Sequence, residues 1–354
     1  MTRAFPALWE ALRVRDHLTL LLAGASLTEE QARVAFGRVL DGEADPAALG
    51  AALALMQARG PTVDELVGAA RAMRERATRV PYESRPGEAL IDTCGTGGAP
   101  KTFNVSTAAA LVVAGARGAA RVRVAKHGNR SRSGRGSAEV LERLGVNVAA
   151  SPSAQALCLE RAGVCFCFAI HHHPAAKHAA AVRAALPFPT VFNLLGPLTN
   201  PANASRQVLG VFERRYVEPM ARALLRLGSE RAMVVHGADG MDEITTTAGT
   251  FCAEVEGGRV TAREIDAAAW GVQRAGLESL VARDLDHAVA MVRGVLEGNG
   301  GPARDVVVVN AAAALAVAGA AEGMADALAL ARESIDSGAA AAALGALAQA
   351  SHEP

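Results

Sequence analysis

The chain reads ALIDTCGTGGAPKTFNVSTAAALVVAGA over residues 89–116, and these residues predict the fold class. Its apolar beginning predicts a short strand at 89–92, which runs into three glycines within the four residues 95–98. The alanine-rich part that follows predicts a helix, with Ser106 or Thr107 at the position of the helix cap. A strand, a glycine-rich turn and a helix in this order are typical of a parallel α/β sheet.

The same stretch predicts an anion-binding loop. Glycines let backbone N–H groups approach an anion closely, and the free amides at the start of a helix point at phosphate. The glycine spacing is not the dinucleotide-binding G-x-G-x-x-G, because position 100 is Pro, and no Gly-Lys-Ser/Thr follows as in a Walker loop. A plain structural turn is the alternative interpretation, since glycine-rich turns are common.

The residues before and after this stretch predict two parts of different architecture. Residues 1–80 contain only helix patterns, with caps at Thr28, Asp45 and Thr62, and the helices are expected to end at 40, 59 and 77. Beyond them, strands and alanine-rich helices alternate, which implies a largely parallel sheet covered by helices. Further strands are expected at 122–124, 145–148, 165–170, 208–211, 232–235, 251–255 and 306–309, and a helix at 339–350.

The composition disfavours a nucleic-acid-binding protein, a disulfide-stabilised protein and a membrane protein. Lys plus Arg equals Asp plus Glu at 36 each, so no global basic field favours nucleic-acid binding. The five cysteines have no framework spacing, and Cys165 and Cys167 are expected to share one buried face of a strand. No signal peptide opens the chain and no apolar run reaches the roughly 20 residues that span a bilayer, so we expect a cytoplasmic protein.

A second loop, residues 124–137, reads VAKHGNRSRSGRGS and gathers Lys, His, Asn, Arg and Ser around three glycines. Cationic and hydroxyl donors of this kind suit a phosphate or a pyrophosphate. A solvated basic loop is the alternative interpretation. Both loops follow strands, which fits ligand binding at the carboxyl ends of the strands of an open α/β sheet.

Three further segments contain candidate functional residues. Asp242 and Glu243 are adjacent carboxylates after a strand and suit Mg²⁺, although acid pairs are also common on surfaces. The histidines 171–173 are expected to line a pocket rather than to hold zinc, because neighbouring residues converge poorly on one tetrahedral ion. Arg183 would suit an organic carboxylate, with an ordinary solvated arginine as the alternative.

Taken in order, four motifs resemble those of the anthranilate phosphoribosyltransferase family. They are Gly-Thr-Gly-Gly with Asn-Val-Ser-Thr, then Val-Ala-Lys-His-Gly-Asn-Arg, then TVFNLLGPLTNP at 190–201, and Met-Asp-Glu at 241–243. The related pyrimidine nucleoside phosphorylases have comparable phosphate loops but lack the Phe-Asn-Leu-Leu-Gly-Pro run. The resemblance implies an α/β fold of the nucleoside phosphorylase and phosphoribosyltransferase type. A small all-helical N-terminal lobe would accompany a larger lobe, whose mostly parallel central sheet is flanked by helices.

The resemblance also implies domain roles and assembly. The helical lobe would be residues 1–80, which some helices of 171–200 could join, and would form a homodimer. The α/β lobe would be residues 81–354, with the substrate site in the cleft between the lobes. The basic loop is one residue shorter than is usual for the family, and Ala99 stands where the family usually has Asp.

The implied reaction transfers the phosphoribosyl group of phosphoribosyl pyrophosphate to the amine of anthranilate in tryptophan synthesis, with Mg²⁺ as cofactor. Ser106, Asp242 and Glu243 would hold the metal ion. Gly95, Asn129, Arg183 and His173 would hold anthranilate, His127 and His173 would line the substrate path, and no general acid or base is assigned. The residues implied for phosphoribosyl pyrophosphate are Gly95, Gly98, Thr102, Asn104, Ser106, Thr107, Lys126, Asn129, Ser133 and Ser137.

Two other functions remain open from the sequence. One is a related phosphoribosyltransferase, or a pyrimidine nucleoside phosphorylase, that uses another acceptor. The other is a non-catalytic paralogue that binds nucleic acid. The retained Lys126, Arg183, Asp242 and Glu243 favour an enzyme, and the zero net charge disfavours a nucleic-acid partner.

Overall fold

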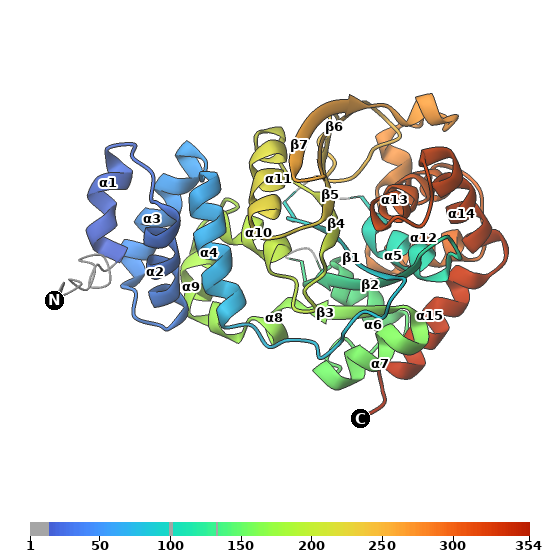
Figure 1. Cartoon of the computed structure of the whole chain (residues 1–354), viewed down its shortest axis with the longest axis horizontal. Coiled ribbons are helices and arrows are strands. Elements are labelled where there is room, and N and C mark those ends of the chain that lie inside the picture. The colour runs from blue at the N-terminus through green and yellow to red at the C-terminus, as the bar shows by residue number, and fades with distance from the viewer. Residues whose placement is uncertain (1–13, 99–101, 132–133) are drawn as a thin grey trace. The chain divides into compact units, whose positions relative to one another are not determined.

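The computed structural model describes residues 14–98, 102–131 and 134–354, and they form two compact units (Figure 1). The helical unit comprises the described residues up to Thr78 together with His172–Thr199. The α/β unit comprises Arg79–His171 and Asn200–Pro354. The chain therefore passes from one unit to the other three times, near residues 78, 171 and 199.

The helical unit begins with the 3₁₀ turn η2 (Val14–His17) and α1 (Leu18–Leu22), followed by three longer helices. These are α2 (Glu29–Leu40), α3 (Pro46–Arg59) and α4 (Val63–Glu75). The three predicted caps are confirmed, because the side chains of Thr28, Asp45 and Thr62 each accept a backbone N–H of the first turn. Helix α4 ends two residues earlier than expected.

A later segment of the chain completes this unit. It contains η3 (Pro174–Ala176), α9 (Lys177–Ala185), α10 (Val191–Leu195) and η4 (Gly196–Thr199). The ring of Phe192 on α10 packs against Phe36 on α2, with 5.7 Å between the ring centroids. Arg74 of α4 donates through Nε to the carbonyl of Leu198 at 2.7 Å. The core of the helical unit therefore needs residues that lie more than a hundred positions apart in the sequence.

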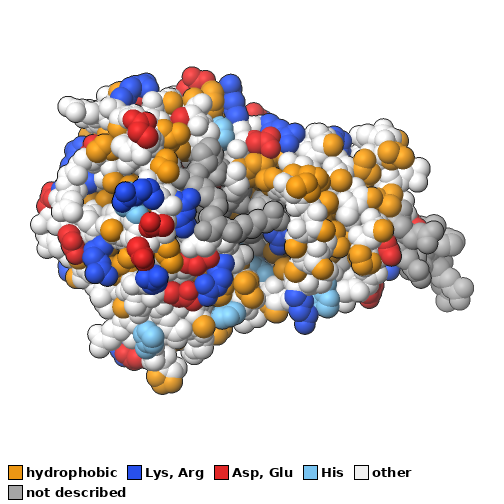
Figure 2. All heavy atoms as spheres, turned by 180° about the vertical axis from the view of Figure 1, so that it is seen from behind, with side chains coloured by type: hydrophobic (Ala, Val, Ile, Leu, Met, Phe, Trp, Pro, Cys, Tyr) orange, Lys and Arg blue, Asp and Glu red, His pale blue; other side chains and the backbone are white. Residues whose placement is uncertain are grey.

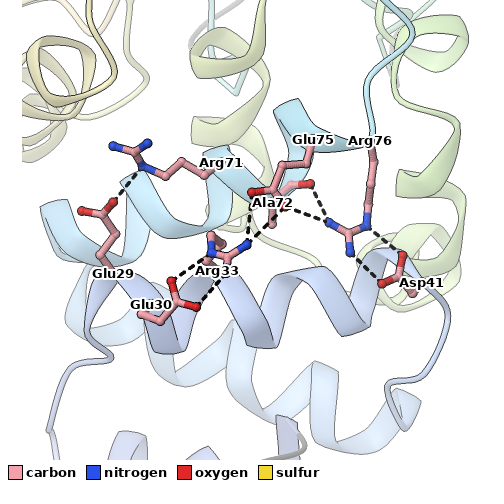
Figure 3. A network of polar contacts seen from close by, with 8 residues as sticks. All are labelled: Glu29, Glu30, Arg33, Asp41, Arg71, Ala72, Glu75 and Arg76. Carbon is pink, nitrogen blue, oxygen red and sulfur yellow. Dashed lines mark hydrogen bonds and ion pairs between the residues drawn. The ribbon is translucent and has the colours of Figure 1, made fainter. Parts of the chain in front are cut away.

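Helices α2 and α4 approach each other closely at Gly68. A Cβ atom at this position would overlap the carbonyl oxygen of Glu29 and lie 2.9 Å from the Ala32 Cβ. Ion pairs connect the exposed edges of the same two helices (Figure 3). They are Arg71–Glu29 at 2.7 Å, Arg33–Glu75 at 3.2 Å and Arg76–Asp41 at 2.7 Å. Exposed pairs contribute little, so the apolar contact beneath them holds the helices together.

The α/β unit is built on one sheet, whose seven strands among the described residues have the order β3-β2-β1-β4-β5-β6-β7. The first five in that order pair in parallel, and β6 and β7 pair antiparallel at one edge. The predicted mostly parallel sheet is therefore confirmed. The strands are β1 (Glu88–Gly95), β2 (Arg121–Gly128), β3 (Val164–Phe168), β4 (Arg206–Gly210), β5 (Arg231–Gly237), β6 (Thr250–Glu256) and β7 (Arg259–Ile265).

Helices flank the sheet, as expected. Helices α5 and α13 pack on the central strands β1 and β4 or their neighbours, and α11 packs on β5, β6 and β7. The helices of this unit are α5 (Val105–Gly115), α6 (Ser137–Arg143), α7 (Pro152–Ala162), α11 (Val217–Arg226), α12 (Leu285–Leu296), α13 (Pro302–Ala318), α14 (Met324–Asp336) and α15 (Ala339–Ala350). Short 3₁₀ turns are η5 (Arg214–Tyr216), η6 (Ala267–Trp270) and η7 (Leu277–Leu280), and α8 (Ala169–His172) lies where the chain leaves the unit. None of the helices in the described ranges is long and apolar enough to cross a membrane.

Several predicted elements are wrong. Residues 145–148 form a loop, because Gly145 has a φ of 90° and Asn147 binds Ser351 through its backbone N–H and its side-chain amide. Residues 306–309 lie inside α13, which is buried almost all round, so burial among apolar neighbours outweighs the strand propensity of valine. The strand expected at 165–170 ends at Phe168. The sequence did not predict the edge strand β7, whose residues are mostly polar and exposed.

Candidate active site

The candidate site lies at the carboxyl ends of the central strands of the α/β unit. Strand β1 has β2 on one side and β4 on the other, and the chain reverses its direction of travel across the sheet there. Ligands of open α/β sheets bind at such a switch point. The predicted loops follow β1 and β2, and the acidic pair follows β5, the neighbour of β4.

Helix α5 begins at Val105 with Asn104 as its N-cap, so Ser106 and Thr107 lie in the first turn and are not the cap. The prediction of a Ser or Thr cap is wrong by two or three positions. Among the described residues, no side chain caps this end of the helix. The Asn104 Oδ1 and Thr107 Oγ1 atoms are buried without a hydrogen-bond partner there. Buried polar atoms are seldom left unpaired, so this end of α5 is suited to a polar ligand.

Lys126 connects the two loops. Its side chain is buried, and Nζ donates to the Thr93 carbonyl at 2.7 Å and to Ser106 Oγ at 3.0 Å. Burial lowers the pKa of Lys126, while the nearby carboxylates of Asp92, Asp242 and Glu243 act in the opposite direction. The residues of three separate motifs thus meet around one ammonium group.

The acidic pair fits against glycines at the ends of β1 and β4. A Cβ atom on Gly95 would lie 2.5 Å from Asp242 Oδ2, and one on Gly210 would overlap the Asp242 carbonyl. Burial raises the pKa of Asp242, and burial together with Asp242 raises the pKa of Glu243 to about 8. The backbone N–H groups of Gly97 and Ser106 act against these shifts. The two carboxyl groups are crowded together, and the backbone N–H of Ser106 donates to Glu243. Paired carboxylates are the oxygen donors that a divalent cation prefers.

Asn310 of α13 fixes the backbone directly after this pair. Its Oδ1 accepts the Ile244 N–H at 3.0 Å, and its Nδ2 donates to the Ile244 carbonyl at 2.9 Å. Both backbone groups of one residue are thereby held by one side chain. In the sequence this residue stood out only as an interruption of an apolar run, and a single buried amide in such a run is the signal that could have identified it.

The basic loop is arranged partly as predicted. The Asn104 Nδ2 donates to the Arg135 carbonyl at 3.2 Å, and Ser137 Oγ donates to the Asn129 carbonyl at 3.4 Å. This brings the loop to the start of α5. Arg130 faces away to an exposed ion pair with Glu142 at 2.5 Å. Ser133 and Ala99 lie outside the described residues.

Two of the predicted anthranilate residues lie in the helical unit. The Arg183 guanidinium lies over the ring of Phe192, 5.1 Å from its centroid. His173 is buried with Nε2 3.3 Å from Thr199 Oγ1, and burial lowers its pKa to about 4. His173 is therefore neutral near pH 7. Gly95 and Asn129, the other two, belong to the α/β unit, so the meeting of all four stays a prediction.

The paired cysteines of β3 behave as ordinary core residues. The thiols of Cys165 and Cys167 are buried with their sulfur atoms 3.7 Å apart, which confirms that they share one face of the strand. No group of three or more metal-ligating His, Cys, Asp or Glu side chains occurs among residues 14–98, 102–131 and 134–354.

Comparisons with known proteins agree with this geometry. The family model described as "Glycosyl transferase family, a/b domain" matches residues 87–341, and the one described as "Glycosyl transferase family, helical bundle domain" matches residues 15–77. An anthranilate phosphoribosyltransferase of Thioalkalivibrio sulfidiphilus is 52% identical over 317 residues, covering 89% of this chain and 92% of that protein. One of Rubrobacter xylanophilus is 51% identical, covering 94% and 95%. The chain belongs to the anthranilate phosphoribosyltransferase family.

Solved structures of anthranilate phosphoribosyltransferases have the same fold. The crystal structure of the enzyme from Thermus thermophilus matches with a TM-score of 0.87 at 39% identity, covering 96% of this chain and all of that one. The enzyme from Saccharomyces cerevisiae in complex with PRPP and Mg matches with a TM-score of 0.85 at 22% identity, covering 96% and 97%. At 22% identity, the similarity to the S. cerevisiae enzyme shows a shared fold and nothing more.

Proposed function

We propose that this chain catalyses the anthranilate phosphoribosyltransferase reaction. The phosphoribosyl group passes from 5-phosphoribosyl 1-pyrophosphate to the amine of anthranilate, giving N-(5-phosphoribosyl)anthranilate and pyrophosphate. The observation that carries the proposal is the convergence of Lys126, Ser106 and the Asp242–Glu243 pair at the carboxyl ends of the strands. The family to which the chain belongs supports anthranilate as the acceptor.

Phosphoribosyl pyrophosphate would bind along the two loops. The residues proposed to hold it are Gly95, Gly98, Thr102, Asn104, Ser106, Thr107, Lys126, Asn129, Ser133 and Ser137. Support comes from the start of α5, where the Asn104 Oδ1 and Thr107 Oγ1 atoms are buried without a partner among the described residues and where the helix dipole favours an anion. The buried ammonium of Lys126 adds a positive charge that water does not screen.

Mg²⁺ fits the donor set of Ser106, Asp242 and Glu243, since hard cations prefer oxygen ligands. The raised pKa of Glu243 supports this assignment, because burial, and after it the charge of Asp242, disfavours the ionised form unless a cation is bound. When bound, Mg²⁺ would neutralise part of the charge on the pyrophosphate group.

Anthranilate would be held by Arg183, His173, Gly95 and Asn129. A guanidinium pairs with a carboxylate through two parallel hydrogen bonds, and stacking on Phe192 restricts the orientation of Arg183. The neutral His173 adds no charge beside the aromatic ring of the substrate.

The chemistry consists mainly of positioning and charge stabilisation. The bond from C1 of the ribose to pyrophosphate breaks, the bond from the anthranilate nitrogen to C1 forms, and the amine then loses a proton. The ribosyl carbon gains oxocarbenium character, so the chain holds both partners and stabilises the departing negative charge. An aromatic amine loses its proton readily once it is bonded to C1, and no strong base is required.

The decisive experiment supplies purified protein with Mg²⁺, phosphoribosyl pyrophosphate and anthranilate, and follows the loss of anthranilate fluorescence. We expect consumption of anthranilate that requires all three additions. Parallel reactions with nucleobases and other aromatic amines test the alternative acceptor. Activity only with one of those, and none with anthranilate, would overturn the proposal.

We further propose that the protein is a cytoplasmic homodimer that associates through its helical unit, and that it uses no nucleic-acid or membrane partner. Figure 2 shows hydrophobic side chains on the surface of this unit. Leu20 and Leu22 of α1 are 42% and 76% exposed. Large contiguous apolar patches, to which these two side chains would contribute, mark interaction sites. Light scattering should give twice the 36.3 kDa mass of one chain, and a monomer would contradict the proposal.

A further inference from the structure

Strands β1 and β2 separate just before the candidate site. Their parallel pairing runs from Glu88↔Arg121 only to Ile91↔Val124. Beyond that point β1 continues beside β4 as far as Gly95, and β2 continues beside β3 as far as Gly128. The two strands that carry the phosphate loops thus lose their backbone hydrogen bonds to each other where those loops begin.

The side chains of Asp92 and Asn200 occupy the gap. Asp92 Oδ1 accepts the backbone N–H of His127 at 3.0 Å, and Oδ2 accepts Nδ2 of Asn200 at 2.8 Å. The same Asn200 nitrogen donates to the Ala125 carbonyl at 2.8 Å. The Asn200 oxygen accepts the Ala202 N–H at 2.9 Å. Backbone groups of β2 that would face β1 in a regular ladder are therefore satisfied by two side chains.

Because both side chains are buried, their hydrogen bonds cannot be replaced by bonds to water. Asp92 is fully buried and Asn200 is 8% exposed, so water cannot replace a lost partner. Two donors converge on the Asp92 carboxyl, and only a group with two acceptor oxygens satisfies both. The next contact across the gap is made by Lys126, whose Nζ reaches the Thr93 carbonyl of β1.

We propose that Asp92 and Asn200 are positioning residues that set the spacing between the two phosphate-binding loops, and that they thereby determine the affinity for phosphoribosyl pyrophosphate. The pair keeps β1 and β2 apart and holds the backbone on either side of Lys126. The inference rests on the proposed function for its ligand. Neither side chain has to touch the substrate for this role.

The same two strands provide a matched control at their other ends. Glu88 of β1 and Arg123 of β2 form a buried ion pair at 3.1 Å, with side chains 5% and 3% exposed. Breaking it removes a buried ionic contact between β1 and β2, while Glu88 keeps the Tyr82 hydroxyl and the Arg85 N–H as donors. It lies where the backbone ladder is intact, so its loss should lower stability without changing the loop spacing.

The experiment compares Asp92→Asn, Asn200→Ala and the control Arg123→Met in the full chain. Asp92→Asn keeps the side-chain volume and one acceptor oxygen. Its NH₂ group, however, faces either the His127 N–H or the Asn200 amide, which are both donors. We expect KM for phosphoribosyl pyrophosphate to rise about tenfold or more in the two site variants, with KM for anthranilate within about twofold of wild type. The control should lower Tm and leave both KM values near wild type.

A lowered Tm with an unchanged KM for phosphoribosyl pyrophosphate in both site variants would reduce the pair to a structural role and overturn the proposal. An equal rise of that KM in Arg123→Met would overturn it as well. If a site variant is poorly soluble, the other one decides, since each removes a different member of the pair.

Hydrogen–deuterium exchange separates failure of this inference from failure of the proposed function. The peptide containing His127 should exchange faster in Asp92→Ala than in wild type, and at the wild-type rate in Arg123→Met. If wild-type protein shows no binding of phosphoribosyl pyrophosphate by calorimetry, the proposed function fails. Unchanged exchange in Asp92→Ala would show that the carboxyl does not hold β2, whether or not the substrate binds.

Discussion

Asp242 and Glu243 are adjacent carboxyl groups whose pKa values are raised above the usual range, so a divalent cation at the pair favours their ionised forms. Replacing both by Ala should abolish Mg²⁺-dependent turnover, with a loss of kcat/KM on the order of a hundredfold or more. The exposed Asp336, paired with Arg304 at 2.6 Å, supplies the control Asp336→Ala, which should keep wild-type turnover. Steady-state kinetics over a Mg²⁺ titration measure the effect, and a double variant with wild-type Mg²⁺ dependence would remove both residues from the metal site.

His173 should make stability depend on pH in the acidic range. Its pKa is about 4 in the folded chain, below the usual 6.5, so between these values the unfolded chain binds a proton that the folded chain does not. The free energy of unfolding should therefore fall as pH drops from 6.5 to 4, by up to about 3 kcal/mol.

The variant His173→Gln removes this titration, so its free energy of unfolding should change less over the same pH range. His178→Gln, at an exposed position of the same unit, is the control and should keep the wild-type slope. Urea unfolding at several pH values measures how the free energy of unfolding of each variant changes with pH. A slope in His173→Gln as steep as in wild type would assign the pH dependence to other groups.

At the scale of elements, the contact of α2 with α4 depends on the missing side chain of Gly68. Gly68→Ala should lower the free energy of unfolding by about 2 kcal/mol, because the new methyl group overlaps the Glu29 carbonyl and forces the helices apart. Gly50→Ala on α3 meets only Val182 Cγ1 at 3.6 Å, which is ordinary contact. It should be neutral or stabilising by up to about 1 kcal/mol through helix propensity.

Chemical denaturation followed by circular dichroism compares the two glycine variants. A Gly68→Ala protein as stable as Gly50→Ala would mean that α2 and α4 adjust to the methyl group at no cost. The close crossing would then not determine the packing of these helices.

At the scale of the whole molecule, the helical unit is discontinuous in the sequence. A fragment ending at residue 80 lacks Phe192, which packs on Phe36, and the Leu198 carbonyl, which accepts from Arg74. We expect this fragment to unfold without a cooperative transition, since a small unit buries too little surface to lose part of its core.

Joining residues 172–199 to the fragment through a Gly/Ser linker should restore a cooperative thermal transition. The same linker followed by a scrambled 172–199 segment is the matched control. A cooperative transition in the fragment of residues 1–80 alone would show that the first helices form an independent domain.

Local signals in the sequence were sufficient for the elements that carry their own boundaries. Thr28, Asp45 and Thr62 each satisfy the amides of the helix that follows, so these helix starts depend on neighbours only three residues away. The glycines after β1 and the alternation of strands and helices predicted the parallel sheet for the same reason. Residues 306–309 show the opposite case, because only the apolar surroundings of α13 decide that these valines are helical.

The motifs alone determined the family and the candidate residues, because each motif is a short run whose chemistry is visible in its letters. Which of these residues lie together depends on how the chain packs in three dimensions. Sequence order does not reveal that β1 lies between β2 and β4, that Gly210 makes room for Asp242, or that Asn310 holds Ile244. Asp92 and Asn200 lie 108 positions apart, and their contact exists because the strands that carry the loops separate there. Such contacts arise from packing over long sequence distances, which a local pattern cannot encode.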